Sequence, residues 1–368
     1  MSFKGVISRS DADQVKLLMS LKQAAYNENR VAGLIRDLKK ARLSQDVYSL
    51  GSELQQRVAE GEDPDDILRD VQQTAFTLET SESGGLSQPD KDVDDWAEYM
   101  LRLAEDPTLA YGLMTGLLKM DKVTTGWHRQ DFSVVGAWTS MGKTAFTIEN
   151  VLRLNKAGFK CAMFSLEMIK RQIYIRMMAN ILQVNLEQFR TGRLAKQHYS
   201  ERMMREKEAL KSIYVDDTRG ISADYIVDVM RRLKRTQGLD FVVVDYLQDV
   251  KERGEQNDNG GSALARVCRK LRAAAKEMDC HVMGLSQVTR GVNDRQDKRP
   301  MVSDLAGSTG IETSADVIAL LYRDDYYNHD SDKKGLLEVN FAKQRNGQLG
   351  IVELAYDRSM QTIRDVFV

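Results

Sequence analysis

Apolar residues change their spacing near residue 130, and this change separates two regions of the chain. Between residues 11 and 80, apolar side chains recur every three or four positions, as they do at Val31, Leu34 and Leu38, which predicts about three helices. Beyond residue 130, short apolar runs of strand length alternate with amphipathic stretches. The pattern therefore predicts a short helical region followed by a larger α/β domain.

The predicted strands of the α/β domain are short apolar runs. They are Phe132–Ala137, Cys161–Ser165, Ile213–Val215, Phe241–Leu247, Val282–Ser286, Val317–Tyr322, Leu337–Phe341 and Ile351–Tyr356. Helices are expected between the first five, at about 143–156, 169–182, 222–236 and 262–278. Such alternation is typical of a mainly parallel sheet with helices on both faces, and the last strands, which no helix separates, are expected to form an antiparallel edge.

The two regions are joined by a segment with the composition of a linker. Residues 80–90 are rich in Ser and Gly, and an acidic amphipathic helix is expected at about 90–104, with Val93, Trp96 and Met100 on its apolar stripe. This helix is either a spacer or buries its stripe against a neighbouring subunit. We expect a helical segment at 1–80, a linker with a docking helix at 81–110 and the α/β domain at 111–368.

Composition narrows the class of protein. Lys and Arg number 53 against 54 Asp and Glu, a balance that does not indicate a general nucleic-acid binder but still allows a local basic channel. The three cysteines lack metal-ligand spacing and are expected to be buried, reduced thiols. No apolar run approaches the ~20 residues that span a membrane. We expect a cytoplasmic enzyme without a membrane partner.

Residues 137–144, Ala-Trp-Thr-Ser-Met-Gly-Lys-Thr, lie between a predicted strand and a predicted helix. A loop of this form presents backbone N–H groups and a helix N-terminus to phosphate, so Ser140, Met141, Gly142, Lys143, Thr144 and Ala145 are expected to bind nucleotide. Lys143 would reach the β- and γ-phosphates, and the Thr144 hydroxyl would ligate Mg²⁺. Ala137 stands where the first Gly of such loops is usual, with Gly136 directly before it. The loop predicts ATP and Mg²⁺ as ligands.

Three polar residues end other predicted strands at the same sheet edge. Asp245 ends Phe241-Val-Val-Val-Asp and is expected to hold the Mg²⁺ shell. Glu167 follows Cys161–Ser165 and is a candidate base for the attacking water, although an isolated Glu is more often a surface residue. Gln287 follows Val282–Ser286 and either contacts the γ-phosphate or is a structural buried Gln.

The order of these motifs resembles the ATPase domain of DnaB-type hexameric replicative helicases, within the RecA-like superfamily. The resemblance runs from Thr124-Thr-Gly-Trp to about Tyr356. It includes Ser140-Met-Gly-Lys-Thr-Ala, Phe164-Ser-Leu-Glu-Met, Arg190-Thr-Gly-Arg-Leu, Asp245-Tyr-Leu-Gln, Leu285-Ser-Gln, Asp297-Lys-Arg-Pro and Lys343-Gln-Arg-Asn-Gly. It implies a RecA-like P-loop fold and ATP-driven DNA unwinding.

The resemblance also implies roles for particular residues. Glu167 would be the catalytic carboxylate, and Gln287 would couple the nucleotide state to loops that bind DNA. Lys343 and Arg345 would act in trans on the γ-phosphate bound by a neighbouring subunit. The implied partners are single-stranded DNA, further copies of the chain in a ring, most simply a hexamer, and a helicase loader or primase.

The chain departs from the family at two places. Only a short helical segment precedes the linker, where the family has a globular domain that forms a collar and contacts primase. The central DNA-binding loop, commonly Asp-Leu-Arg-Glu-Ser-Gly, here reads Asp304-Leu-Ala-Gly-Ser-Thr-Gly310, so Ala306 and Gly307 replace Arg and Glu. The lost cation should weaken DNA binding and its salt dependence.

Other residues are expected to compensate for that lost cation. The candidate DNA contacts are Arg253, Arg290, Arg295, Lys298, Arg299, Ala306, Gly307 and Thr309, the non-basic ones through their backbone. A denser basic cluster at residues 231–235 is interpreted as a solvated helix face. Few aromatic residues are interleaved with these cations, so contact with the DNA backbone is expected rather than base stacking.

The favoured hypothesis is an ATP-dependent helicase that translocates on single-stranded DNA during replication, in a bacterial or phage-infected cell. The alternative is a RecA-like DNA-dependent ATPase that does not unwind, such as a recombination mediator, a loader or an assembly factor. A third hypothesis is a P-loop enzyme of small-molecule metabolism. Trans-acting Lys343 and Arg345 argue against the third, because such an enzyme needs no neighbour to complete its site.

Overall fold

The computed structural model describes residues 45, 48–64, 66–67, 70–71, 89–194, 203–252, 261–345 and 347–366. Most of the helical segment predicted at residues 1–80, and residues 81–88 of the predicted linker, lie outside these residues. Residues 48–59 are helical. The chain divides into two units, residues 1–100 and 101–368. The boundaries predicted at residues 80 and 110 stay predictions.

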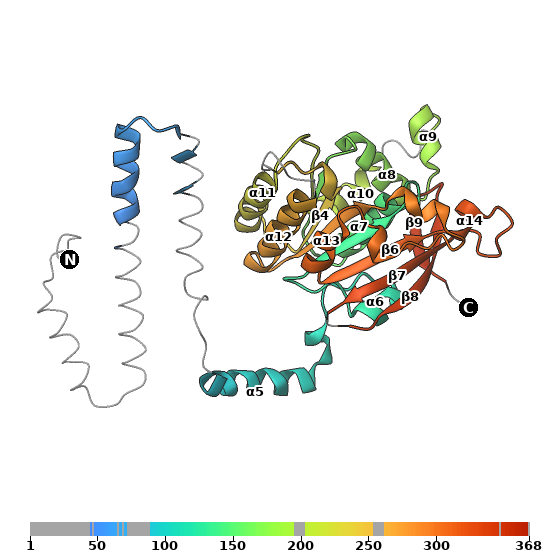
Figure 1. Ribbon diagram of the computed structural model, residues 1–368, viewed down its shortest axis with the longest axis horizontal. Helices are drawn as coiled ribbons and strands as arrows, with labels where there is room; N and C mark the ends of the chain where they lie inside the picture. The colour runs from blue at the N-terminus through green and yellow to red at the C-terminus, as the bar shows by residue number, and fades with distance from the viewer. Residues whose placement is uncertain are drawn as a thin grey trace, which may run out of the picture. The chain divides into compact units, whose positions relative to one another are not determined.

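Strands and helices alternate through the second unit (Figure 1). The strands are β1 (Phe132–Ala137), β2 (Cys161–Ser165), β3 (Ile213–Asp216), β4 (Phe241–Asp245), β5 (His281–Gln287), β6 (Val317–Tyr322), β7 (Leu336–Gln344), β8 (Gly350–Asp357) and β9 (Thr362–Asp365). The α-helices are α6 (Leu118–Thr124), α7 (Lys143–Lys156), α8 (Lys170–Leu182), α9 (Leu186–Thr191), α10 (Met203–Glu206), α11 (Ala223–Thr236), α12 (Gly261–Glu277), α13 (Ser308–Ser314) and α14 (Asp324–Tyr327). Short 3₁₀ helices are η1 (Pro107–Ala110), η3 (Glu208–Leu210), η4 (Leu247–Asp249), η5 (Arg290–Asp294) and η6 (Val302–Asp304).

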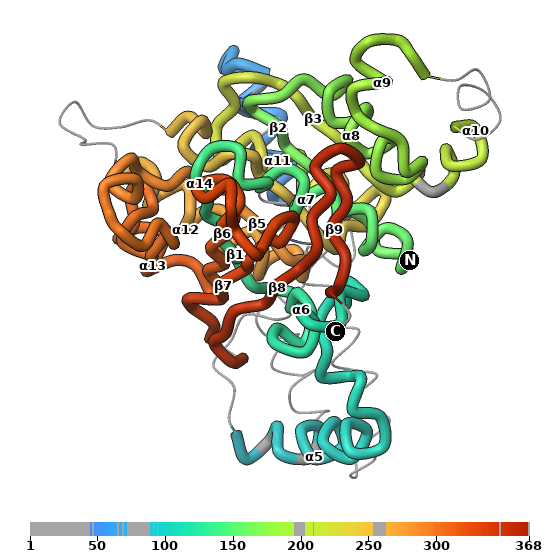
Figure 2. The backbone as a smooth tube through the Cα atoms, turned by 90° about the vertical axis from the view of Figure 1, so that its right-hand side faces the viewer, coloured from blue at the N-terminus to red at the C-terminus, as the bar shows by residue number. Residues whose placement is uncertain are grey.

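The strands form one mixed sheet in the order β3-β2-β4-β5-β1-β6-β7-β8-β9. Pairing is parallel from β3 to β6 and antiparallel from β6 to β9, which confirms the predicted parallel sheet with an antiparallel edge. Strands β6 to β9 lie side by side in Figure 2. Strand β9 was not predicted, and it extends this edge.

Helices cover both faces of the sheet because alternate side chains of each strand point to opposite sides. Phe132 and Val134 of β1 belong to the core that includes α11, α12 and α13. Val135 and Ala137 of the same strand belong to the core that includes α6, α7 and α8. Every residue of β1 is buried, as expected for a central strand covered on both faces.

The predicted thiols and the predicted lack of a membrane span can be compared with this architecture. Cys161, Cys268 and Cys280 are free and buried, as predicted. Within the described part of the chain, no helix is long and apolar enough to cross a membrane.

The amphipathic helix predicted at residues 90–104 is α5 (Pro89–Glu105). Most of its apolar side chains are exposed, with 62% of Trp96, 53% of Val93 and 41% of Met100 accessible to solvent. Exposed apolar side chains spaced three and four residues apart form a stripe along one side of a helix.

Candidate nucleotide-binding site

A cleft of about 960 Å³ opens at the carboxyl edge of the parallel strands. The phosphate loop after β1, the residues after β2, helices α8 and α9, the end of β5 and strand β8 all contribute to it. The lining residues include Ser140, Gly142, Lys143, Thr144, Ala145, Glu167, Arg176, Arg190, Gln287, Tyr356 and Arg358. The parallel topology brings these distant segments together, because the carboxyl ends of neighbouring parallel strands meet at one edge.

The backbone of the phosphate loop turns sharply before α7. Gly142 has a φ of 107°, and a Cβ at this position would stand 3.1 Å from Cε1 of Tyr356. A side chain would therefore be strained by both its backbone angle and its space. Met141 and Ala145 are buried in the core, and the loop presents its backbone at the N-terminus of a helix, as anion binding requires.

The Lys143 side chain lies back along its own loop. Its Nζ donates to the carbonyl oxygens of Ala137 at 3.0 Å and of Ser286 at 3.3 Å. Burial lowers the pKa of Lys143, while the carboxylates of Asp245 and Glu167 oppose that shift. A phosphate anion bound in the cleft would stabilise the charged form of Lys143, which burial disfavours.

Thr144 and Asp245 form the pair that would hold a divalent cation. The hydroxyl of Thr144 lies 3.5 Å from Oδ2 of Asp245. Burial, followed by the nearby Glu167 carboxylate, raises the pKa of Asp245 to about 6. A buried carboxylate whose charge is disfavoured, beside a hydroxyl oxygen, fits Mg²⁺, which prefers hard oxygen donors and binds few protein ligands.

Glu167 and Gln287 stand at the same cleft. Glu167 is exposed just beyond β2 and faces the opening. Gln287 ends β5, and its carbonyl oxygen accepts a hydrogen bond of 3.1 Å from the backbone N–H of Ala306. Gln248 adds a second link, because its Nε2 donates to Oγ of Ser286 at 2.8 Å and to the Ala306 carbonyl at 3.4 Å. The strand end beside the cleft is thus bonded to the loop that was predicted to bind DNA.

Lys343 and Arg345 lie at the other end of the sheet. Lys343 pairs with Ile318 near the beginning of β6, whereas the phosphate loop follows the end of β1, to which β6 is parallel. The Lys343 ammonium donates to the Glu312 carbonyl, and Arg345 forms an ion pair with Asp316 at 3.2 Å. Neither side chain can reach the cleft of its own chain.

Three of the predicted DNA contacts are held by contacts within the chain. Arg295 makes a two-pronged pair with Asp304, at 2.9 and 2.7 Å. Arg299 does the same with Glu338, at 2.7 and 2.9 Å. Lys298 donates to the carbonyl of Asn293 at 2.6 Å. These bonds favour a structural role for the three cations, because a phosphate would have to compete with a partner already in place.

The other predicted contacts differ in exposure. Arg290 and Thr309 are exposed, and Ala306 is partly buried. The segment that was predicted as a loop becomes α13 at Ser308, directly after Gly307, whose φ is 73°. A Cβ at Gly307 would stand 2.6 Å from Leu264, so the Glu usual there would not fit without repacking. Arg253 lies outside the described residues.

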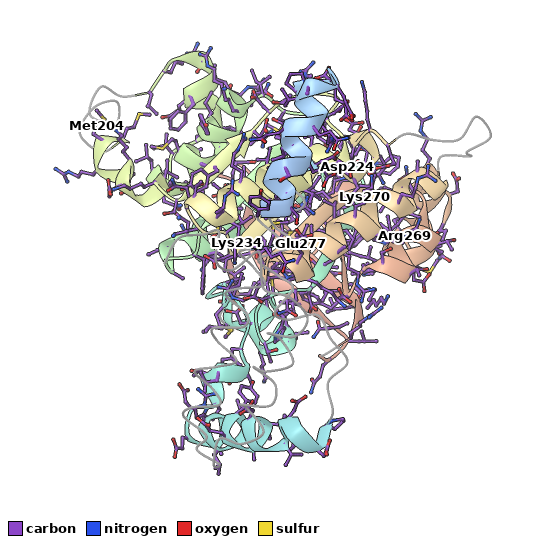
Figure 3. The ribbon with its side chains drawn as sticks, turned by 90° about the vertical axis from the view of Figure 1, so that its left-hand side faces the viewer. Met204, Asp224, Lys234, Arg269, Lys270 and Glu277 are labelled. Carbon is purple, nitrogen blue, oxygen red and sulfur yellow. The ribbon has the colours of Figure 1, made fainter. Side chains whose placement is uncertain are left out.

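The basic cluster at residues 231–235 lies on α11, and Figure 3 views this face. Arg231 pairs with Glu277 at 2.6 Å, and Lys270 of α12 pairs with Asp224 at 2.8 Å. Asp224, Lys234, Lys270 and Glu277 are labelled in the figure. Alternating charges along two neighbouring helices agree with the interpretation of a solvated face.

The comparisons with known proteins agree with this geometry. Residues 112–365 match the model of the DnaB-like helicase C-terminal domain, which is most of the chain. The chain belongs to the DnaB-like helicase family. The matched segment contains the cleft, the phosphate loop and both residues at the far end of the sheet.

Relatives within the DnaB-like family are named for replication. The chain is 41% identical over 249 residues to the replicative DNA helicase DnaB of Geobacillus stearothermophilus, covering 67% of this chain and 54% of the relative. It is 37% identical over 300 residues to the replicative DNA helicase DnaC of Bacillus subtilis (strain 168), covering 79% and 65%. The chain thus spans between half and two thirds of the length of these two relatives.

Solved structures show the same fold. One of them, described as an ATPase domain, superimposes with a TM-score of 0.71 at 32% identity, over 77% of this chain and all of that one. A DnaB-like replicative helicase, described with its interactions with primase, superimposes with a TM-score of 0.74 at 27% identity, over 96% of this chain and 83% of that one. These neighbours confirm the predicted RecA-like α/β fold.

Several cleft residues of this DnaB-like domain were not assigned from sequence, and four of them carry an Arg or Tyr side chain. Arg176, Arg190, Tyr356 and Arg358 line the cleft. Burial lowers the pKa of Arg176 and raises that of Tyr356. Arg190 stood in a motif that carried the resemblance, so that motif was a usable signal. The others gave none, because their place at the cleft depends on how α8 and β8 lie in the fold.

Proposed function

We propose that this chain is an ATP-dependent DNA helicase that moves along single-stranded DNA during replication. One observation carries the proposal. Lys143, Thr144, Glu167 and Gln287 line one cleft, and Asp245 lies behind it, 3.5 Å from the Thr144 hydroxyl. Lys343 and Arg345 lie at the opposite end of the same sheet. A second copy is then needed to complete each ATP site, and copies arranged head to tail close into a ring when the rotation between them allows.

The roles of these side chains follow from their chemistry. Lys143 and the N–H groups of the loop hold the phosphates, and Ser140, Met141, Gly142 and Ala145 contribute through their backbone. Thr144 and Asp245 would hold Mg²⁺, which would neutralise charge on the phosphate oxygens. Glu167 orients and deprotonates the attacking water. Arg345 and Lys343 of a neighbour stabilise the charge that develops on the γ-phosphate. Gln287 transmits the state of that phosphate through its carbonyl bond to Ala306.

DNA contact is proposed at the exposed residues near Ala306. Arg290 and Thr309 are accessible, and the backbone of Ala306 and Gly307 adjoins them. We assign Arg295, Lys298 and Arg299 to holding this region in shape, since each already has intramolecular partners. Contacts of this type grip phosphates without reading sequence.

Assembly is proposed to involve α5. The exposed stripe of Val93, Trp96 and Met100 would be buried against the next copy, in keeping with a linker at residues 81–110 and an ATPase domain at 111–368. We propose a hexameric ring, acting in the bacterial cytoplasm, because the named relatives are bacterial replicative helicases. A loader and a primase are the further partner classes. Primase is named in the description of one structural neighbour.

The test of catalysis is the variant Glu167→Gln in the full chain. Single-turnover ATP hydrolysis should fall by about 10²–10⁴-fold, because the general base is lost, while binding of a fluorescent ATP analogue stays within a few fold. Glu206→Gln on α10 is the matched control and should leave hydrolysis unchanged. Full activity of Glu167→Gln would refute the assignment of the base.

The alternative function, a DNA-stimulated ATPase that does not unwind, is motivated by Ala306 and Gly307, which replace the Arg and Glu usual in the family. The names of the relatives do not favour it. A strand-displacement assay on a forked duplex separates the two hypotheses. ATP hydrolysis stimulated by single-stranded DNA, without displacement of the second strand by confirmed ring assemblies, would support the alternative.

A further inference from the structure

A buried carboxylate joins three elements at the end of the sheet away from the cleft. Asp316 stands directly before β6 and is 3% exposed. Its Oδ2 accepts a hydrogen bond of 3.0 Å from the backbone N–H of Phe132, the first residue of β1. Its Oδ1 accepts one of 2.8 Å from Nη2 of Arg272 in α12 and lies 3.2 Å from Nε of Arg345. The carboxylate is therefore anchored in the rigid core of the domain.

The backbone repeats the same connection. The N–H of Asp316 donates to the carbonyl of Phe132 at 2.7 Å, and the N–H of Arg345 donates to the carbonyl of Asp316 at 3.1 Å. Arg345 is thus tied to Asp316 through both its main chain and its side chain, just beyond the end of β7. A residue that follows a strand keeps a defined position only where such bonds continue beyond the ladder.

Only one nitrogen of the Arg345 guanidinium takes part in this ion pair. Its side chain is 46% exposed, and the contact with Asp316 is made through Nε. Among the described residues, the Arg345 side chain forms no hydrogen bond. The terminal nitrogens, which form the fork that binds phosphate, are therefore available at the surface.

Asp316 does not need Arg345 for its own stability. Arg272 and the Phe132 N–H already satisfy both carboxylate oxygens, as a buried charge requires. The ion pair matters more for Arg345 than for Asp316, because it restricts the rotamers of the Arg345 side chain. An exposed Arg without such a partner samples many rotamers and loses that freedom when it binds a ligand.

We propose that Asp316 is a positioning residue for Arg345, and that it holds the guanidinium ready for the ATP phosphates of a neighbouring copy. The inference rests on the proposed trans role of Arg345. It assigns Asp316 no contact with ATP. Its effect is to remove part of the ordering that the guanidinium would otherwise undergo as the transition state forms.

The test combines Asp316→Asn and Arg345→Ala in the full chain, with ATP and single-stranded DNA. Asp316→Asn should lower kcat for ATP hydrolysis about tenfold and leave KM within twofold, since ATP bound by the loop is not disturbed. In the Arg345→Ala background, Asp316→Asn should cause no further loss, because the two side chains act as one unit. Multiplicative losses would overturn the proposal.

Mixed assemblies provide a measurement that would not change if Asp316 had only a structural role. Lys143→Ala subunits cannot hydrolyse ATP but keep an intact Asp316 and Arg345. Mixing them with Asp316→Asn subunits should give more hydrolysis than the sum of the two separate preparations, because each Asp316→Asn cleft next to a Lys143→Ala subunit receives an ordered Arg345. Hydrolysis no greater than that sum, while wild-type subunits mixed with Lys143→Ala stay active, would place Asp316 in its own subunit's site and contradict the inference.

The remaining outcomes are also decisive. Full activity of Arg345→Ala would refute the trans role itself, and the inference would fall with it. Loss of activity in Arg345→Ala, with full activity in folded Asp316→Asn, would refute the inference alone. If Asp316→Asn does not fold, Asp316→Glu keeps the charge and moves it by one methylene. Its loss of kcat should again vanish in the Arg345→Ala background, and persistence of that loss would overturn the proposal.

Discussion

At the scale of single residues, the folded structure disfavours the negative charge of Asp131, a residue that lies far from the candidate nucleotide cleft. Burial, followed by the Asp316 carboxylate, raises the pKa of Asp131 to about 6. The folded protein therefore binds this proton more tightly than the unfolded chain does. The resulting stability is fully present below pH ~4 and is lost as the pH rises through about 6.

Asp131→Asn should consequently stabilise the protein at pH 7.5. We expect a gain of ~1 kcal/mol, reduced for partial exposure to solvent, and a rise in Tm of about 2 °C. At pH 3.5, below the ordinary pKa of Asp, the two proteins should unfold at nearly the same temperature. Thermal unfolding followed by circular dichroism tests this, with Asp332→Asn, an exposed carboxylate before β7, as control. A gain that is equal at both pH values would contradict the assignment to Asp131.

At the same scale, some residues of the candidate site could be predicted from sequence patterns, whereas the contacts of others depend on the geometry of the folded chain. Lys143 and Thr144 belong to a local motif whose meaning depends on its immediate neighbours, and Asp245 ends an apolar strand, so all three could be placed at the cleft. The ion pairs of Arg295 and Arg299 could not be predicted, because their partners Asp304 and Glu338 are distant in space until the chain folds. A free cation and a paired one look the same in a sequence.

At the scale of elements, the segment around η5 and α13 separates two kinds of basic residue. Arg290→Ala should weaken binding to single-stranded DNA and reduce the slope of log K against log salt by about 0.7, the contribution of one phosphate contact. Fluorescence anisotropy across a salt series measures this slope. An unchanged slope would remove Arg290 from the DNA contacts.

Arg295→Ala is the matched comparison on the same segment. It leaves Asp304, whose side chain is 12% exposed, without its cationic partner and should lower the free energy of unfolding by about 2–3 kcal/mol. The salt slope for DNA should not change, because the guanidinium is not available to phosphate. Denaturant unfolding and the same anisotropy series test both statements. A reduced slope with normal stability would return Arg295 to the DNA-binding set.

Elements with strong periodicity were predicted to within a residue or two. Strands β1 and β2 and helix α7 agree with their predicted bounds, because each has a clear apolar period and α7 follows a glycine turn. Helix α13 was expected as a loop, since its seven residues are mostly small and polar. Strand β9 is only four residues long, and it is held by pairing with β8 rather than by a pattern of its own.

At the scale of the whole molecule, the exposed stripe of α5 predicts how copies associate. Trp96→Ala removes the largest apolar side chain of that stripe and should shift assemblies toward monomers, lowering the association constant at least tenfold. Sedimentation velocity over a range of concentrations measures the shift, with Glu98→Gln on the same helix as control. If Trp96→Ala assembles normally, the stripe is not part of the interface.

The strand order illustrates what the sequence leaves open at this scale. Alternation predicted a parallel sheet, but the position of β1 between β5 and β6 depends on pairings across more than a hundred residues. That order determines which strand ends surround the cleft.

If Arg345 acts in trans as proposed, its separation from the cleft gives each subunit one end that donates Arg345 and an opposite end that accepts it. In a closed ring of such subunits, every acceptor is matched. In an open chain, one acceptor at one end and one donor at the other have no counterpart, whatever the number of copies. A ring that opens to admit a DNA strand would therefore have one inactive ATP site at the gap. The number of active sites would then show whether the ring is closed.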